Sequence, residues 1–171
     1  MTAGPSSSTN ISSLHNVIVS VQEEERPSND SCDGATSLVT LTVAKSGTTA
    51  GAFPDFDLET CGIPAVSRGV WFSYVGKGND VRASVSQVDY NSKIAVFEGS
   101  CNSLVCIGSN DGPFVATSAL TFAAKAGKTY QILLSGAKGF DDAGKFNLEI
   151  TVGAMHSSCF LLFVNESTFI A

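Results

Sequence analysis

Histidine is scarce in this chain, which limits the chemistry that the chain can support. Only two histidines occur in 171 residues, His15 near the start and His156 near the end. The sequence contains no H-E-x-x-H, G-x-S-x-G or P-loop pattern. His156 and Cys159 could imitate a nucleophile pair, but no third group is present to orient the histidine. The sequence therefore predicts that the protein is not an enzyme.

Charged residues are also few, at 15% of the chain, and the formal net charge is -6. An acidic chain without a stripe of Lys or Arg is repelled by phosphate backbones and anionic lipid, which excludes nucleic acid as a partner. The apolar run 160–164 is far shorter than the roughly 20 residues of a membrane helix. No membrane insertion is predicted. Two carboxylate pairs, Asp55 with Asp57 and Asp141 with Asp142, lie in turn-rich segments where solvated Asp is common.

The residues that are abundant favour strands joined by turns. The chain is 43% hydrophobic and contains 16 Gly and 11 Phe, and its length suits one domain. Apolar and polar residues alternate in 145–152, 81–86 and 130–135. Eight or nine short strands without helical periods predict an all-β fold, an antiparallel β-sandwich or jelly roll. The other strands are expected at 37–43, 48–52, 70–75, 92–98, 104–109 and 118–124.

Composition divides the chain into three parts. Residues 1–28 are rich in Ser, Thr and Asn and are predicted to be a disordered lead and linker, with one short strand at 17–21. Residues 29–153 carry the strand pattern and form the predicted sandwich domain. Residues 154–171 break the pattern, and we interpret them as an aberrant tail that begins another repeat.

Four of the five cysteines predict disulfides rather than a metal site. Cys32 and Cys61 bracket one stretch, and Cys101 and Cys106 bracket another, without C-x-x-C spacing or neighbouring histidines. Disulfides indicate an oxidising compartment, so we predict an extracellular or cell-surface protein. Three N-x-S sequons fit a secretory route and are candidate glycosylation sites: Asn10, Asn29 and Asn165.

No signal peptide is recognised in residues 1–13, which contain no basic segment followed by an apolar one. The chain is therefore expected to be a fragment of a longer exported protein. The alternative is that the cysteines are reduced.

A single tryptophan, Trp71, lies in the segment 70–75, which is apolar on both of its predicted faces. Such a strand is expected at the centre of a sheet, with Trp71 filling the core between the two sheets. The alternative is that Trp71 stacks on a sugar ring at the surface. The same alternatives apply to Tyr74, Tyr90 and Tyr130.

No cofactor is predicted, with calcium as the alternative. Ser109-Asn-Asp-Gly112, with Asp80 or Asp89 nearby, could supply oxygen ligands to a hard cation. Asx turns at strand ends explain the same residues, Asp111 included, and the spacing matches no EF-hand.

Several motifs, taken in order, resemble the prepeptidase C-terminal (PPC-like) β-sandwich domains, in the cysteine-bearing repeat variant of extracellular proteins. The resemblance extends from Asn29 to about Val152. It rests on the order of the motifs at 29–35, 48–51, 61, 70–74, 94–101, 104–111 and 127–136.

The resemblance implies a jelly-roll-like domain without catalytic activity and a pairing of Cys32 with Cys61 and of Cys101 with Cys106. Cys159 is left without a partner, where another repeat could begin. It implies a binding or adhesion module, one unit of a larger protein, that recognises a glycan or an extracellular protein through loops at one end of the sandwich. The alternative is an accessory domain of a secreted protease or other hydrolase, and a third possibility is a solubilising scaffold. The ligand and the oligomeric state are not predicted.

Overall fold

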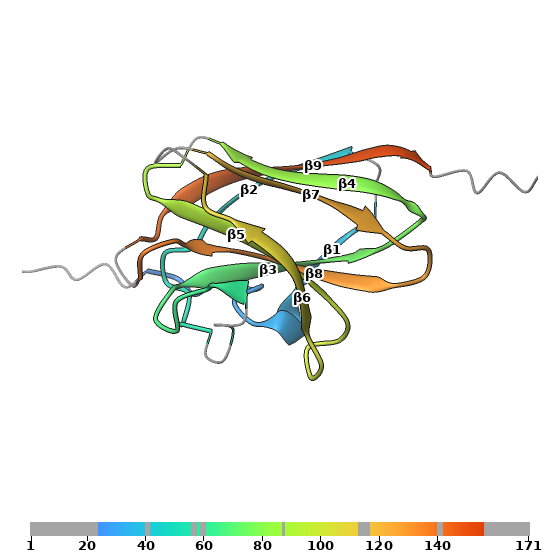
Figure 1. Ribbon diagram of the computed structural model, residues 1–171. Coiled ribbons are helices and arrows are strands. Elements are labelled where there is room, and N and C mark those ends of the chain that lie inside the picture. The colour runs from blue at the N-terminus through green and yellow to red at the C-terminus, as the bar shows by residue number, and fades with distance from the viewer. Residues whose placement is uncertain are drawn as a thin grey trace, which may run out of the picture.

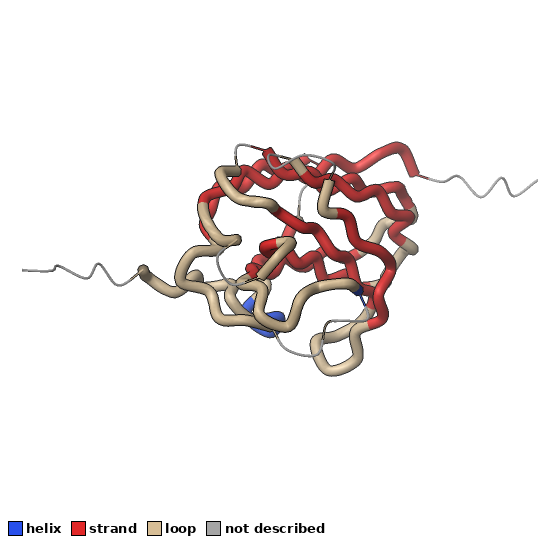
Figure 2. The backbone as a smooth tube through the Cα atoms, turned by 60° about the vertical axis from the view of Figure 1, so that its left-hand side comes forward, coloured by secondary structure: helices blue, strands red, loops and turns tan. Residues whose placement is uncertain are grey.

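The protein is a two-layer β-sandwich (Figure 1), which confirms the predicted fold class. The computed structural model describes residues 24–39, 42–55, 58, 61–86, 88–112, 117–139 and 142–155. Within these ranges the only helical element is the 3-10 turn η1 (Cys32–Gly34), and Figure 2 shows how strands dominate the rest. The strands are β1 (Thr36–Leu38), β2 (Thr42–Thr48), β3 (Gly69–Val75), β4 (Asn79–Ser86), β5 (Ser92–Glu98), β6 (Val105–Asn110), β7 (Ser118–Ala124), β8 (Thr129–Gly136) and β9 (Lys145–Met155).

One sheet has five strands in the order β1-β3-β8-β5-β6, and the other has four in the order β2-β9-β4-β7. All pairs are antiparallel except β1 with β3, which is parallel. In β4 and β9 buried and exposed side chains alternate, as the sequence pattern predicts for strands with one solvated face. The strands β3, β5 and β8 are buried on both faces.

The main core lies between the sheets. Val81, Ile94, Ile132 and Leu134 are fully buried there, and Phe72 packs edge-on against Phe146. These side chains occupy alternate positions of their strands, so each strand contributes one apolar row to the core. Burial of such rows is the main stabilising term of a sandwich.

A second core covers the outer face of the five-stranded sheet, and this location corrects the prediction for Trp71. The side chain is 1% exposed, but it packs with Phe97 and Leu133 under loops rather than between the sheets. The reason is that successive side chains of a strand point to opposite faces. Val70 and Phe72 point into the inter-sheet core, so Trp71 must point to the other face. Burial also excludes a sugar platform at Trp71, and the three tyrosines named above are buried as well.

We call the segments over this second core the loop cover. It consists of residues 24–35, the described part of 49–68, and residues 99–104. Its apolar side chains, which include Leu58, Ile63 and Leu104, pack onto the sheet. A loop layer of this kind explains why β3, β5 and β8 need no polar face.

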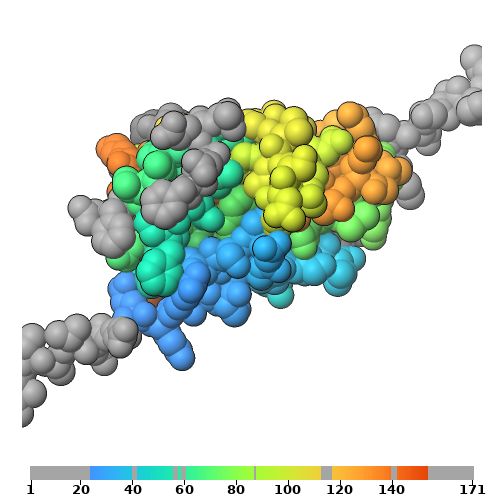
Figure 3. Space-filling model, turned by 90° about the horizontal axis from the view of Figure 1, so that it is seen from below, coloured from blue at the N-terminus to red at the C-terminus, as the bar shows by residue number. Residues whose placement is uncertain are grey.

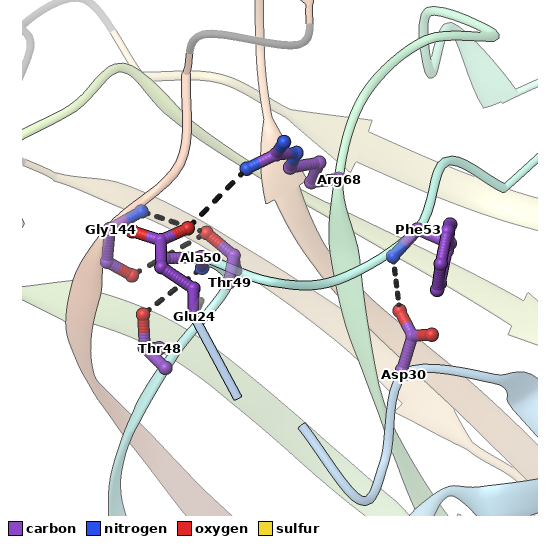
Figure 4. Close-up of polar contacts among 8 residues, drawn as sticks. All are labelled: Glu24, Asp30, Thr48, Thr49, Ala50, Phe53, Arg68 and Gly144. Carbon is purple, nitrogen blue, oxygen red and sulfur yellow. Dashed lines mark hydrogen bonds and ion pairs between the residues drawn. The ribbon is translucent and has the colours of Figure 1, made fainter. Parts of the chain in front are cut away.

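Two strand predictions are wrong near the start of the domain. The segment 37–43 contains the end of β1 and the start of β2, and these strands belong to different sheets, so the chain crosses the sandwich between them. The segment 48–52 is mainly a turn in which Gly51 has a φ of 79°. Thr49 and Gly144 exchange hydrogen bonds there, and the Ala50 N–H donates to Thr48 Oγ1 (Figure 4). The bonds between Thr49 and Gly144 directly follow the β2–β9 ladder, and the chain turns after them.

The predicted strand at 17–21 and the tail 156–171 lie outside the described residues. Residues 24–28, which composition places in the linker, instead lie against the domain, with the Glu24 carboxylate 3.6 Å from Arg68 Nη1. Among the described residues, none of the helical structure is long or apolar enough to span a membrane.

Candidate binding pocket beside the disulfide-linked loops

Within the loop cover, a buried carboxylate joins the N-terminal segment to the 49–68 segment. Asp30 Oδ1 accepts a hydrogen bond of 2.7 Å from the Phe53 N–H (Figure 4), and Asp30 Oδ2 is paired with Arg26. The guanidinium of Arg26 also lies 4.5 Å from the centroid of the Phe53 ring. Next to Asp30, the Asn29 carbonyl accepts from the Trp71 N–H at 2.8 Å. Residues 26–30 therefore have a fixed position beside β3.

Two disulfides complete the attachment of the cover, and their pairing corrects the one implied by the resemblance. Cys32 is bonded to Cys101, and Cys61 to Cys106. Cys106 lies opposite Phe97 in the β5–β6 ladder, while Cys101 lies in the loop between these strands. The two cysteines of the hairpin are therefore not bonded to each other. Cys106 is bonded to Cys61 in the second core.

The observed disulfides constrain the unfolded chain more than the disulfides implied by the resemblance would. The sequence separations are 69 and 45 residues, and chain-entropy arguments assign about 4 kcal/mol to each loop of such length. Both bridges join the cover to the same hairpin. They hold the cover against the sheet from two sides.

A pocket of about 440 Å³ lies where β3 ends and β8 begins. Its floor is formed by Ser73 and Gln131, which are paired across β3 and β8. One wall is η1, the other is the loop that contains Cys101, and the Cys32–Cys101 disulfide joins the two walls. Figure 3 shows this face, on which the N-terminal segment (blue), the β5–β6 hairpin (yellow) and the start of β8 (orange) come together. The remaining lining residues are Asp33, Ala35, Glu98, Gly99, Ser100, Gly127, Lys128 and Thr129.

Gln131 is the unusual residue of the pocket. Its side chain is 6% exposed, yet Oε1 has no hydrogen-bond partner among the described residues. An unpaired buried carbonyl costs about 1–3 kcal/mol. Water or a ligand donor in the pocket would recover this free energy, and for this reason the pocket is the strongest candidate site.

At one rim of the pocket, the negative charge of a carboxylate is balanced by two ammonium groups. The Glu98 carboxylate lies 3.9 Å from the ammonium of Lys128 and 3.9 Å from that of Lys125. Lys128 is 59% exposed, so its ion pair with Glu98 is loose and screened by solvent. Asp33, on the opposite wall, is exposed and no ion pair is formed by it among the described residues.

The sequence analysis interpreted Asp55 as a solvated turn residue, and the structure corrects this, because Asp55 is largely buried. Burial raises the pKa of Asp55 to about 7, although the hydrogen bond from Trp71 Nε1 to Oδ1, 3.0 Å long, opposes this rise and the nearby charge of Asp30 adds to it. Oδ2 is buried and has no hydrogen-bond partner in the part of the chain that the structure describes. Asp55 belongs to the loop cover and does not line the pocket.

The other sequence candidates are not brought together. Asn110 Oδ1 accepts from the Gly112 N–H at 2.6 Å, an Asx turn of the kind that explains this motif without calcium. Asp142 Oδ2 accepts from the Lys138 N–H. Across the described ranges, no three His, Cys, Asp or Glu side chains form a metal-binding group.

One of the three sequons can be placed. Asn29 is partly buried, and its Nδ2, the atom that would carry a glycan, donates to the Trp71 carbonyl at 2.9 Å. Asn10 and Asn165 lie outside the described residues, as do both histidines, Cys159, Asp57 and Asp141.

Two solved structures resemble the sandwich. A periplasmic inhibitor of g-type lysozyme from Aeromonas hydrophila has 14% sequence identity and a TM-score of 0.47, and covers 69% of this chain and 95% of its own. The pre-peptidase C-terminal domain of a collagenase from Bacillus anthracis has 13% identity and a TM-score of 0.46, and covers 68% of this chain and 94% of its own. No family model matches the chain, and no curated protein matches it.

The pocket itself was missed by sequence reasoning. The available signal was the presence of Ser73 and Gln131 within two strongly apolar segments. In a strand that is covered on both faces, an isolated polar residue must have a partner or a function. That inference requires the register of β3 and β8, which sets the two side chains next to each other.

Proposed function

We propose that this chain is a non-catalytic extracellular binding module that recognises a protein or glycan partner through loops at one end of the sandwich. The observation that supports this proposal is the buried side-chain carbonyl of Gln131, which has no hydrogen-bond partner among the described residues and lies beside a loop-lined pocket. The pocket volume of about 440 Å³ lies within the range of about 300–1,000 Å³ that is usual for ligand sites.

The disulfides support the proposed extracellular or cell-surface location. Both bridges link loops that lie far apart in sequence, and such bonds persist in oxidising surroundings. A protein that depends on them for the shape of its pocket is suited to the extracellular space or the cell surface.

The absence of catalysis is proposed from the location of the one carboxyl group with a suitable pKa. A pKa of about 7 would fit Asp55 for general-base work. However, Asp55 Oδ1 is engaged by Trp71 beneath the loop cover. A substrate in the pocket would not meet this carboxylate, because the pocket is lined by other residues.

The test is a binding screen on the oxidised 171-residue chain labelled with ¹⁵N. Mono- and oligosaccharides and short peptides are added one at a time, and amide signals are followed. We expect saturable shifts at Ser73, Thr129 and Gln131, with no change at Thr121, which is exposed on the four-stranded sheet. If every compound leaves the three pocket signals unchanged while the protein stays folded, the proposal is refuted.

A further inference from the structure

The chemical groups of the pocket favour a ligand that donates hydrogen bonds and carries positive charge. Gln131 Oε1 is an unpaired acceptor at the floor, and two acidic residues, Asp33 and Glu98, are part of the lining. Lys128 is the single cationic residue among the lining residues that the structure describes; it is paired with Glu98, which is also paired with Lys125 outside the lining, whereas Asp33 forms no ion pair among the described residues. A ligand that donates hydrogen bonds and carries positive charge complements this arrangement.

Other ligand classes fit less well. The described lining includes no aromatic side chain, so a sugar ring would find no flat apolar surface on which to stack. An anionic ligand would face Asp33 and Glu98 in a chain whose formal net charge is -6. The same net charge would steer a cationic partner toward the protein.

From these contacts we infer that the pocket receives an arginine side chain of a partner protein; this inference rests on the proposed function and specifies its ligand. A guanidinium is planar and presents five N–H donors in diverging directions. Its donors can reach the acidic residues of the walls, and a turn of the Gln131 side chain toward the pocket would bring the enclosed Oε1 within reach of one of them. The disulfide between Cys32 and Cys101 holds those walls at a fixed separation.

The position of Lys128 gives the inference an unusual consequence. Its ammonium is 3.9 Å from Glu98 Oε1 and largely exposed, so it competes with an incoming guanidinium for that carboxylate. Removal of this lysine should strengthen binding of arginine. A residue with a purely structural role would weaken binding or leave it unchanged.

The experiment titrates the full oxidised chain with the peptide acetyl-Gly-Arg-Gly-amide and follows the side-chain amide signals of Gln131. The matched control peptide contains citrulline, which has nearly the same shape but no charge. We expect the arginine peptide to bind at least tenfold more tightly than the citrulline peptide, and its affinity to fall as salt rises. Equal affinities for the two peptides would overturn the inference.

Three variants locate the binding. Gln131→Met keeps the length of the side chain but removes the amide, and should weaken binding about tenfold. Asp33→Asn changes an exposed residue without risk to the fold and should weaken binding two- to fivefold. Lys128→Gln should strengthen it by a similar factor, and Thr121→Val on the other sheet should have no effect.

The outcomes separate this inference from the proposed function. If saccharides shift the Gln131 signals and the arginine peptide does not, the site is a glycan site, and the arginine inference is wrong while the binding module stands. If neither shifts them, both proposals fail. An arginine effect that Asp33→Asn and Lys128→Gln leave unchanged would place the binding elsewhere and refute the assignment to this pocket.

Discussion

Replacement of Asp55 by Asn should make the protein more stable at neutral pH. The folded state raises the pKa of Asp55 from 3.8 to about 7, chiefly through burial. Between these values the folded protein retains a proton that the unfolded chain releases. The stabilisation that comes from this proton is therefore fully present below about pH 4 and is lost as the pH rises toward 7.

The size of the effect follows from the shift of about three pKa units. Each unit corresponds to about 1.4 kcal/mol, so ionisation of Asp55 costs the folded state at most about 4 kcal/mol at pH 8. Asn retains an oxygen for the Trp71 indole N–H and carries no charge. We expect Asp55→Asn to match the original protein at pH 4 and to exceed its free energy of unfolding by up to about 4 kcal/mol at pH 8.

Urea denaturation, followed by the fluorescence of the sole tryptophan, measures both values. Trp71 is buried and bonded to Asp55, so its emission reports on the second core. Asp111→Asn is a suitable control, because Asp111 is exposed at the end of β6. The reasoning is refuted if Asp55→Asn retains the original pH dependence, or if it is less stable at pH 8. Either result would mean that the carboxylate is ionised and stabilising.

Three further predictions concern the fold. Replacement of both Cys61 and Cys106 by Ser should cost about 2–4 kcal/mol and shift the Trp71 emission to longer wavelength, since the bridge closes the second core. Gly99→Ala should cost at least about 3 kcal/mol, because φ is 118° and the new Cβ would lie 2.2 Å from the Ser103 carbonyl oxygen. Gly127→Ala is its control, with a φ of 75° and nothing within 4 Å, and should cost about 1 kcal/mol. Leu134→Ala, at a fully buried inter-sheet site, should cost about 2–5 kcal/mol in thermal or urea unfolding.

Local patterns were sufficient to predict most strands. The alternation in 145–152 and 81–86 reflects one buried and one solvated face, and both segments are strands of the four-stranded sheet. The turn at 126–128 was also predictable, because Gly127 has a φ of 75° that suits glycine.

Long-range features could not be predicted in the same way. The crossing between β1 and β2 is invisible in the sequence, because the segment 37–43 has strand propensity throughout. Trp71 was expected in a core, but the choice between two cores depends on which face of β3 the loops cover. Disulfide partners depend likewise on tertiary placement, and four cysteines allow three pairings.

The pocket required still more information. Ser73 and Gln131 are 58 positions apart in numbering and become neighbours only through the β3–β8 register. The surrounding walls come from η1 and the β5–β6 loop, which are joined by a disulfide that the family resemblance paired differently.

The burial of β3, β5 and β8 on both faces divides the molecule into a layer that tolerates substitution and one that does not. Arg82, Glu149 and Thr151 project from the four-stranded sheet into solvent. Changes at these positions disturb neither core and lie on the sheet opposite the pocket. A dye, a surface-immobilisation tag or a new charge pattern can therefore be placed on this layer while the ligand-facing layer stays intact.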